Sequence, residues 1–520
     1  MKKLLSLVVV IASAAGILWA SGASDPKAAG TVPADKVFSV VFWQHSPWTR
    51  GSLPKPEEDF IAQHARDKYK IDLKLQIAPA DGADAKLNAM IAGGEIPDLI
   101  QAYWGMGDTI VKEFVEQGII VPLDSYLPKY AFLNSFLNDT EHWPYLTYDG
   151  KKVALGQPLP VQNWYTVWVR QDWLDALGMP QPKTIDDLSA LALAFTAKDP
   201  DGNGKADTYG FTSVTTTNNF FGELPSVFAP FGGHPGRNNM VVRNGRLVMD
   251  GFSGETKNAL AWWHQQVQAK AVDPNWTTNK YDNWRESAIS GKVGIISAQF
   301  QLLREDTQSV NVFGKEIMAA NPKARWVQLP AIKGPFGSYT NWNTNGTDNR
   351  FFITRKALSE PGKIEALLSW LNDVLNPKTD TYVLTIRGQE GLDYRRDSSG
   401  RIAERIINAE RSWKSYYSVF RLGDEDYFYP SYKALPNDVW GKFQLTIKQP
   451  RILNVNGLIK SHSRWPDLRF YMEEMHMKFA LGVEPLSNWD AFVETARKTY
   501  GLDEILADGE AQLKKLGMLK

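Results

Sequence analysis

Apolar and polar residues alternate along the first part of the chain with two different periods. Residues 37–43 are nearly all apolar and residues 71–77 alternate strictly, so both indicate strands, as do residues 98–103. Residues 83–92 and 108–117 have apolar positions at helical spacing, and glycine follows each of them. This alternation of strand and helix predicts an α/β layer with a mostly parallel sheet.

Helical patterns dominate the rest of the chain. Thr184, with Asp187 three residues later, indicates a helix start at which the two residues cap the backbone. Trp262 and Trp263 fall inside a later helix and are expected in the core. From about residue 255 we predict helices over 256–269, 282–290, 360–375, 402–411, 466–481 and 488–498.

The N-terminal residues have the pattern of a signal peptide. Lys2 and Lys3 precede a short apolar run from Leu4 to Ala15, and small residues follow at 20–23. We expect residues 1–23 to be the signal peptide, residues 24–36 to be a flexible tether, and the mature protein to be periplasmic or extracellular. The alternative is an uncleaved membrane anchor, although the run is shorter than the ~20 residues of a membrane span.

Composition narrows the possible functions. A chain of 520 residues is too long to fold around one ordinary hydrophobic core, so two or more lobes are expected. Lys plus Arg equals Asp plus Glu, 58 each, which argues against a nucleic-acid partner. The absence of cysteine excludes disulfides, thiol catalysis and lipid attachment through an N-terminal cysteine. The 19 tryptophans are unusual, and tryptophan rings can stack on sugar rings.

Six short motifs occur in a characteristic order between residues 37 and 480. They include the segment Ala92–Leu99, which joins a helix end, a turn and a strand, and Arg387–Tyr394 at the end of the series. Together they resemble the family 1 extracellular solute-binding proteins, in particular the long oligosaccharide-binding members that include alginate-binding proteins. The motifs cover residues 92–99, 117–124, 149–153, 169–174, 290–294 and 387–394.

This resemblance implies a type II periplasmic-binding-protein fold, in which two α/β lobes are joined by crossover strands with a ligand cleft between them. We expect lobe 1 to contain residues 37–160 and about 295–355, and lobe 2 to contain about 161–294 and about 356–520. The implied function is carbohydrate binding, with delivery by cleft closure to the transmembrane permease of an ABC transporter. A monomer is expected.

Two other functions remain open at this stage. A secreted polysaccharide-degrading enzyme needs only a pair of carboxylates, which the sequence supplies in abundance. Against it, the chain has no His-Glu-x-x-His, nucleophile elbow, phosphate loop or dinucleotide motif, so we expect no enzyme activity. A sugar-sensing co-receptor with the same fold would use the same binding chemistry as a transporter component.

An acidic loop is the sharpest local motif. Its oxygen-bearing residues have the spacing of an EF-hand loop, which suits Ca²⁺, and the position that turns sharply is a glycine. The final bidentate glutamate is replaced by Gly210, so the loop is not a full EF-hand. We expect a structural Ca²⁺ here, and the alternative is a solvated turn without metal. The expected ligands are Asp199, Asp201, Asn203, Lys205 through its carbonyl, and Asp207.

Candidate sugar-binding residues follow from the need for aromatic faces and planar polar groups beyond the carboxyl ends of strands. The best candidates follow the first strand, and an amide-rich loop surrounds a later tryptophan. For each tryptophan the alternative is packing in the core. The expected ligand-binding residues are Trp43, Gln44, Trp48, Trp104, Trp276, Trp284, Trp342, Asn343 and Tyr394.

Overall fold

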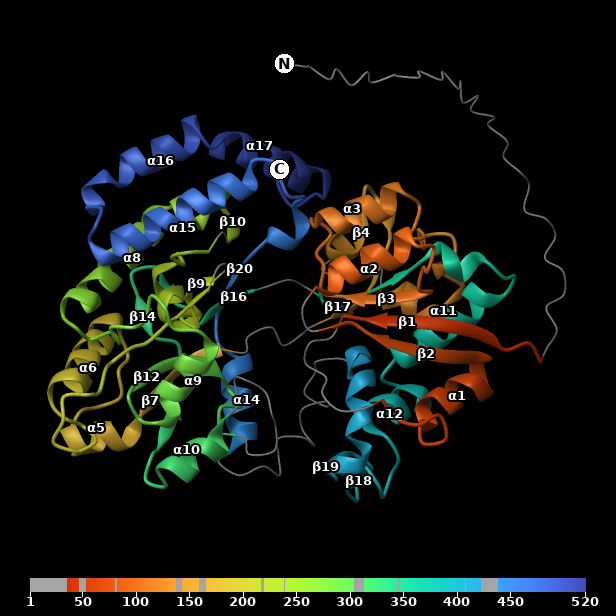
Figure 1. Cartoon of the computed structure of the whole chain (residues 1–520), viewed down its shortest axis with the longest axis horizontal. Coiled ribbons are helices and arrows are strands. Elements are labelled where there is room, and N and C mark those ends of the chain that lie inside the picture. Colours follow the sequence, from red (N-terminus) through yellow and green to blue (C-terminus); the bar gives the residue numbers. More distant parts are fainter. Residues whose placement is uncertain are drawn as a thin grey trace, which may run out of the picture.

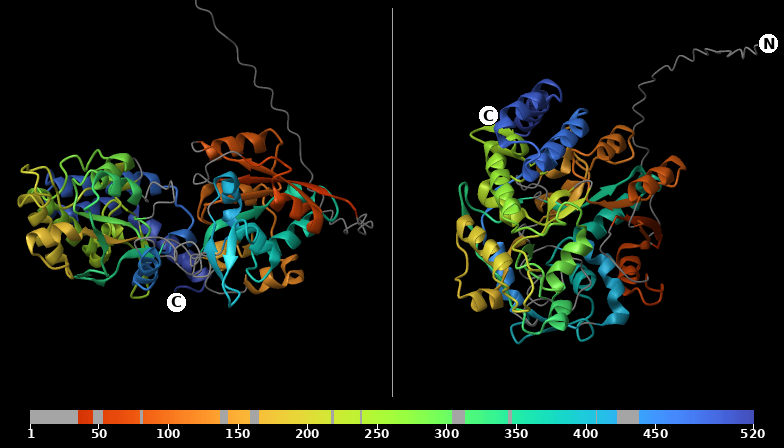
Figure 2. Two further views of the ribbon diagram at one scale, coloured as in Figure 1. Left: turned by 90° about the horizontal axis from the view of Figure 1, so that it is seen from below. Right: turned by 60° about the vertical axis from the view of Figure 1, so that its left-hand side comes forward.

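The protein folds into two lobes that lie side by side (Figure 1). The computed structural model describes residues 35–45, 53–79, 82–136, 143–158, 165–216, 219–237, 239–303, 313–343, 347–406, 408–421 and 438–520. In a view from below, the two lobes remain separate bodies that meet along a narrow region (Figure 2). The expected two-lobe α/β fold is therefore confirmed.

Lobe 1 is built on a five-stranded sheet of order β2-β1-β3-β17-β6. Strand β1 pairs in parallel with β2 and β3, and Phe42 lies opposite both Leu75 and Leu99. Strand β17 runs antiparallel to β3 and β6. The strands are β1 (Phe38–Gln44), β2 (Ile71–Ile77), β3 (Leu99–Ala102), β6 (Leu155–Pro158) and β17 (Thr347–Ile353).

Helices and two small hairpins complete lobe 1. The core gathers residues of β1, β3 and β17 with residues of α1, α3 and α11. The helices are α1 (Phe60–Tyr69), α2 (Ala83–Ala92), α3 (Thr109–Glu116), α4 (Ala131–Phe136), α11 (Lys363–Val374) and α12 (Asp380–Arg387), with η1 (Leu127–Lys129), η2 (Trp143–Leu146), η5 (Arg355–Leu358) and η6 (Ala409–Phe420). The hairpins are β4 (Thr147–Tyr148) with β5 (Lys151–Lys152), and β18 (Tyr394–Arg396) with β19 (Ile402–Arg405).

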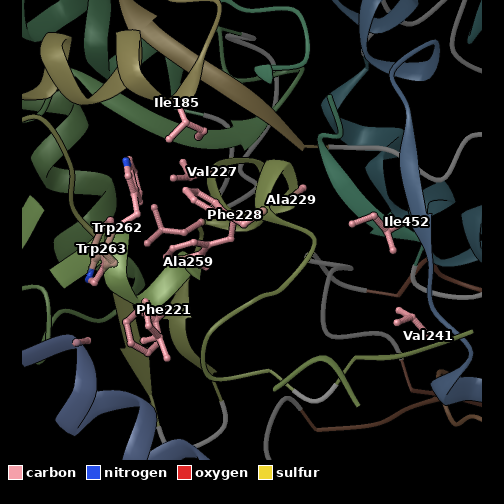
Figure 3. Close-up of a cluster of buried hydrophobic side chains, with 14 of the residues drawn as sticks. Ile185, Phe221, Val227, Phe228, Ala229, Val241, Ala259, Trp262, Trp263 and Ile452 are labelled. Atoms are coloured by element: carbon pink, nitrogen blue, oxygen red, sulfur yellow. The ribbon is translucent and has the colours of Figure 1, made fainter. Parts of the chain in front are cut away.

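Lobe 2 is built around a three-stranded sheet of order β12-β7-β13 and many helices. Its core contains an aromatic group in which Trp262 and Trp263 pack beside Phe228 and Phe221 (Figure 3). Both tryptophans are buried, so their expected place in the core is confirmed. The sheet strands are β7 (Tyr165–Arg170), β12 (Ile295–Gln299) and β13 (Trp326–Gln328).

The remaining elements of lobe 2 surround that sheet. The strands are β8 (Val214–Thr216), β9 (Asn219–Gly222), β10 (Met240–Arg243), β11 (Arg246–Met249), β14 (Lys333–Gly334), β15 (Gly337–Ser338), β16 (Asn341–Asn343) and β20 (Arg451–Leu453). The helices are α5 (Gln171–Leu177), α6 (Ile185–Ala197), α7 (Pro225–Phe228), α8 (Gly254–Gln268), α9 (Tyr281–Ile289), α10 (Gly314–Ala320), α14 (Val439–Ile447), α15 (Trp465–Leu481), α16 (Trp489–Lys498) and α17 (Leu502–Lys515), with η3 (Ala229–Phe231), η4 (Asp250–Phe252), η7 (Asn456–Leu458) and η8 (Leu486–Asn488).

The structure divides the chain differently from the expected lobe boundaries. Residues 295–303 and 313–343 belong to lobe 2, because β12 and β13 both pair with β7. Residues 356–406 and 408–420 belong to lobe 1, because α11 and η6 pack in the core of its sheet. The physical reason is that an amphipathic pattern reveals which face of an element is buried, but not against which core.

Local predictions were more accurate than long-range ones. The Thr184–Asp187 capping box is present, with the Asp187 amide donating to Thr184 Oγ1 at 3.1 Å. The helix expected over 402–411 is wrong, because residues 402–405 form β19 in a hairpin with β18. Pairing with a neighbouring strand therefore outweighs the helical spacing in that segment.

Candidate ligand-binding site

Two chain crossings locate the edges of the lobes that face each other. Strand β6 ends at Pro158 in lobe 1 and β7 begins at Tyr165 in lobe 2. A residue spans at most ~3.6 Å, so these ends lie within about 25 Å of each other. The second crossing, from Asn343 to Thr347, is shorter still. The carboxyl ends of β1 and β3 lie at the same edge as Pro158, and in such sheets this edge is where ligands bind.

Buried amides line that edge of lobe 1. Gln101 Nε2 donates to Asn349 Oδ1 at 2.7 Å, and Gln44 Nε2 donates to the Tyr416 carbonyl at 2.9 Å. The side-chain oxygens of Gln44 and Gln101 are buried and accept no hydrogen bond from any described residue. Unpaired buried acceptors cost free energy, so two of them at one edge indicate a place for a hydrogen-bond donor. We call Gln44, Gln101 and Asn349 the amide wall.

An aromatic group lies next to the amide wall. The His45 ring is 6.2 Å from the Tyr103 ring and 6.3 Å from the Trp104 ring. Trp104 Nε1 donates to Asp84 Oδ1 at 3.1 Å, and its ring contacts Phe114 and Phe352. Trp104 is therefore held by lobe 1 at the end of β3. Its indole N–H already has a partner, and its ring is buried in the lobe 1 core.

The facing edge of lobe 2 has a buried carboxyl group between phenols. Glu223 is 4% exposed, and the hydroxyls of Tyr165 and Tyr281 hydrogen-bond to its carboxylate. Its Oε2 atom accepts no hydrogen bond from any described residue. Burial raises the pKa of Glu223 to about 7, against the opposing effect of the nearby Arg237. We call Glu223, Tyr165 and Tyr281 the phenol wall.

The backbone at the phenol wall is strained. Phe221 and Glu223 have φ of 55° and 59°, a region that residues with a side chain rarely adopt. Gln299 ends β12 opposite Tyr165 and its side chain hydrogen-bonds to the Tyr165 hydroxyl. Strain of this kind costs free energy and persists where the surrounding contacts fix it, most often at functional sites.

The lobes also meet at a seam on one side. The Ser461 amide donates to the Gly107 carbonyl at 3.0 Å, and Lys460 Nζ is 2.7 Å from Asp149 Oδ1. A cavity of about 330 Å³ lies there, lined from lobe 1 by Tyr103 and Asp108 and from lobe 2 by Trp465. A Cβ atom at Gly107 would overlap the Ile459 carbonyl oxygen, so only glycine allows this close approach.

The expected sugar-binding residues do not all come together. Gln44 and Trp104 lie at the lobe 1 edge, and Trp43 lies beside them on β1 with its ring buried in the core. Trp276 packs against Phe221 and Trp263 in lobe 2.

The other candidates are scattered or outside the described side chains. Trp284 packs against Phe313 in a separate lobe 2 cluster. Tyr394 is buried in the β18–β19 hairpin of lobe 1. Trp48 lies outside the described residues. For Trp342 and Asn343 only the backbone is described, and it pairs with β20.

The acidic loop keeps its oxygen ligands close together. Asn203 Nδ2 donates to Asp201 Oδ2 at 2.8 Å and to Asp207 Oδ1 at 3.1 Å. Burial, followed by a hydrogen bond with Asp199, raises the pKa of Asp201, while backbone hydrogen bonds, led by that from Gly204, lower the pKa of Asp199. The Asn203 amide thus bridges two of the carboxylates expected to bind Ca²⁺. Among the described residues, no three His, Cys, Asp or Glu side chains already form a metal-binding group.

Most residues of the two walls were not predicted as site residues from the sequence. Gln101 is the last residue but one of β3, so the rule of carboxyl ends could have found it. Glu223 follows a short hairpin with no distinguishing motif, and its partners Tyr165 and Tyr281 are distant in sequence. No sequence signal brings these three together.

Comparisons with known proteins decide the family. A sequence model described as the bacterial extracellular solute-binding protein matches residues 60–338, more than half of the chain. The chain belongs to this family. The resemblance found in the sequence is thereby confirmed. Among the described residues, no helix of this solute-binding protein is both long and apolar enough to span a bilayer.

Individual relatives are similar at low identity. A lipoprotein, LipO, of Bacillus subtilis is 25% identical over 382 residues, which cover 71% of this chain and 68% of the relative. The polygalacturonan/rhamnogalacturonan-binding protein YtcQ of Bacillus subtilis is 22% identical, over 65% of this chain and 64% of its own length. The ABC-transporter substrate-binding protein FusA of S. pneumoniae, solved with kestose, has the same fold, with a TM-score of 0.65, 19% identity, and coverage of 92% and 99%.

Proposed function

We propose that this solute-binding protein binds an oligosaccharide between its lobes and delivers it to the transmembrane permease of an ABC transporter. The observation that carries the proposal is the pair of polar walls at the two edges where the chain crosses. Gln44 and Gln101 offer buried oxygen atoms to the hydroxyl groups of a sugar. One relative is named for binding polygalacturonan and rhamnogalacturonan, and a solved structure of the same fold holds kestose, and all of these are carbohydrates.

The two walls explain how binding could drive closure. A ligand shifts an equilibrium between open and closed lobes only if it binds the closed state more tightly. A sugar that contacts the amide wall of lobe 1 and the phenol wall of lobe 2 at once has that preference. The seam at Gly107 and Ser461 keeps one side of the lobes together, so motion would be a hinge about it.

The proposal includes the absence of catalysis, a monomeric state and no nucleic-acid partner. Balanced charge, with 58 basic and 58 acidic residues, supports the last point. A secreted polysaccharide-degrading enzyme and a sugar-sensing co-receptor remain as alternatives. Glu223 is the acid that an enzyme would use, but it is enclosed by two phenols and has no second carboxylate among the groups that influence it.

Intrinsic tryptophan fluorescence of the purified mature protein, titrated with an oligosaccharide panel, tests the proposal. The sugars are followed by chromatography in the same samples. A saturable change with unchanged sugars is the expected result. Cleavage of a sugar would establish the enzyme alternative, and the absence of any saturable change would contradict carbohydrate binding.

We also propose that the acidic loop binds a structural Ca²⁺. The carboxylates of Asp199, Asp201 and Asp207, the side-chain oxygen of Asn203 and the carbonyl of Lys205 are hard oxygen ligands, which Ca²⁺ prefers. The ion would fix the loop after α6 and take no part in sugar binding. Calorimetry with CaCl₂ should show one site that Asp201→Asn weakens strongly. Equal Ca²⁺ binding by both proteins would contradict this assignment.

The N-terminal residues are proposed to direct export. Residues 1–23 would be removed and residues 24–36 would tether the mature protein, with no lipid on cysteine because the chain has none. The intact mass of the exported protein tests this cleavage. A mature mass that includes residues 1–23 would contradict it.

A further inference from the structure

The phenol wall has an arrangement of hydrogen bonds that selects among sugars. Glu223 is buried, and the hydroxyls of both Tyr165 and Tyr281 bond to its carboxylate. A phenol that donates its single proton to a carboxylate has only its lone pairs left for another partner. The Tyr165 oxygen also meets the Gln299 side chain, so the Tyr281 oxygen is the acceptor that can reach a ligand.

Access to this wall comes through Tyr281. Its side chain is 38% exposed at the first position of α9, whereas Glu223 behind it is 4% exposed. The exposed phenol ring also gives a flat face on which a sugar ring can stack. Glu223 consequently acts through the two tyrosines, as a positioning residue.

We propose that Glu223 fixes the Tyr281 hydroxyl as a hydrogen-bond acceptor, so that lobe 2, while Glu223 is ionised, selects an uncharged, hydroxyl-bearing sugar ring over a uronic acid. This inference rests on the proposed function and specifies its ligand. A sugar hydroxyl can donate to the Tyr281 oxygen. The carboxylate of a uronic acid has no proton to donate at neutral pH and would meet an acceptor backed by a negative charge.

The charged groups around Glu223 support this selection. Arg237 is the only cation among the groups that affect the Glu223 carboxyl, and its charge is offset by Glu223 itself. The pKa of the Tyr165 hydroxyl in turn depends on its burial and on Glu223, Gln299, Tyr281 and Arg237. While Glu223 is ionised, no unbalanced cation therefore acts on it to attract a uronate, within the described part of the chain.

The protonation of Glu223 makes the selection dependent on pH. When the carboxylate is ionised it can accept from both phenols, and when it is protonated it loses one of these bonds. Because burial raises the pKa of Glu223 to about 7, this change falls between pH 6 and 8. Affinity for a neutral sugar should therefore be about fivefold higher at pH 8 than at pH 6, the effect of one hydrogen bond.

The test is calorimetric titration of the full mature protein with fructo-oligosaccharides and with oligogalacturonates of the same length, at pH 6 and pH 8. At pH 8, where Glu223 is ionised, we expect the neutral sugars to bind at least about tenfold more tightly than the uronates. The variant Glu223→Gln should bind neutral sugar at both pH values as the wild type does at pH 6. Tyr281→Phe, which removes an exposed hydroxyl and is expected to fold normally, should lower the affinity for neutral sugar several-fold.

A matched control separates the effect of Glu223 from that of a histidine at the lobe 1 edge. His45 lies at the facing edge of lobe 1, near Asp84. His45→Gln should keep the ratio of affinities between pH 8 and pH 6. Tighter binding of uronates, or an unchanged pH ratio in Glu223→Gln, would overturn the inference while leaving sugar binding intact. Failure of both sugar classes to bind would overturn the proposed function and this inference together.

Discussion

The two walls of the proposed site use different chemistry for the same task. The amide wall of lobe 1 offers neutral oxygens of Gln44 and Gln101, which do not titrate. The phenol wall of lobe 2 depends on one titratable carboxyl, Glu223. One lobe can therefore supply affinity that does not change with pH, while the other supplies selection by charge and pH.

The largest expected effect comes from the amide wall. Gln101→Leu removes the donor to Asn349 and the buried oxygen proposed to meet the ligand. We expect sugar affinity to fall by about tenfold or more, since a lost buried hydrogen bond costs about 1–3 kcal/mol. The ratio of affinities at pH 8 and pH 6 should stay at the wild-type value. Calorimetry at both pH values measures this.

Gln171→Leu is the matched control, because Gln171 is a surface glutamine that bonds to Asp175. It should leave affinity unchanged. If Gln101→Leu bound sugar as well as this control does, the amide wall would not be part of the site.

A second buried carboxyl in lobe 2 separates stability from ligand binding. Asp250 accepts a hydrogen bond from Asn239 at 2.9 Å, and burial raises its pKa to about 8. The folded protein therefore holds a proton that the unfolded chain has lost above pH 4, so this group makes stability fall as the pH rises toward 8. His476 has the opposite effect on stability. Burial lowers its pKa to about 4, so this group makes stability rise with pH, but only below about pH 6.5.

We expect the free energy of unfolding of the wild type to decrease between pH 6.5 and 8, and Asp250→Asn to reduce that decrease by about 1 kcal/mol. Urea unfolding at several pH values measures it. The same variant should retain the wild-type pH dependence of sugar affinity. Loss of that dependence would mean that the phenol wall is not its only source.

The smallest effect is expected at the seam that joins the lobes. Lys460 Nζ pairs with Asp149 Oδ1 at 2.7 Å, and both groups are substantially exposed. Asp149→Asn should change the free energy of unfolding by only ~0.2–1 kcal/mol, the usual value of an exposed ion pair. A shift in affinity of more than tenfold would show that the seam, and not the two walls, controls closure.

The sequence predicted local structure better than the site. Residues 71–77 and 83–92 were predicted with the same bounds as β2 and α2, because period and flanking residues define them locally. The lobe to which α11 belongs could not be predicted, since its apolar face fits either core. Glu223, Tyr165 and Tyr281 meet only through tertiary packing, and the φ of 59° at Glu223 leaves no mark in the sequence.

Small-angle X-ray scattering with and without a bound fructo-oligosaccharide tests the central claim most directly. If one sugar contacts the amide wall and the phenol wall together, the radius of gyration should fall on saturation, and Tyr281→Phe should require more sugar for the same change. A saturating sugar that leaves the radius of gyration unchanged would contradict binding between the lobes.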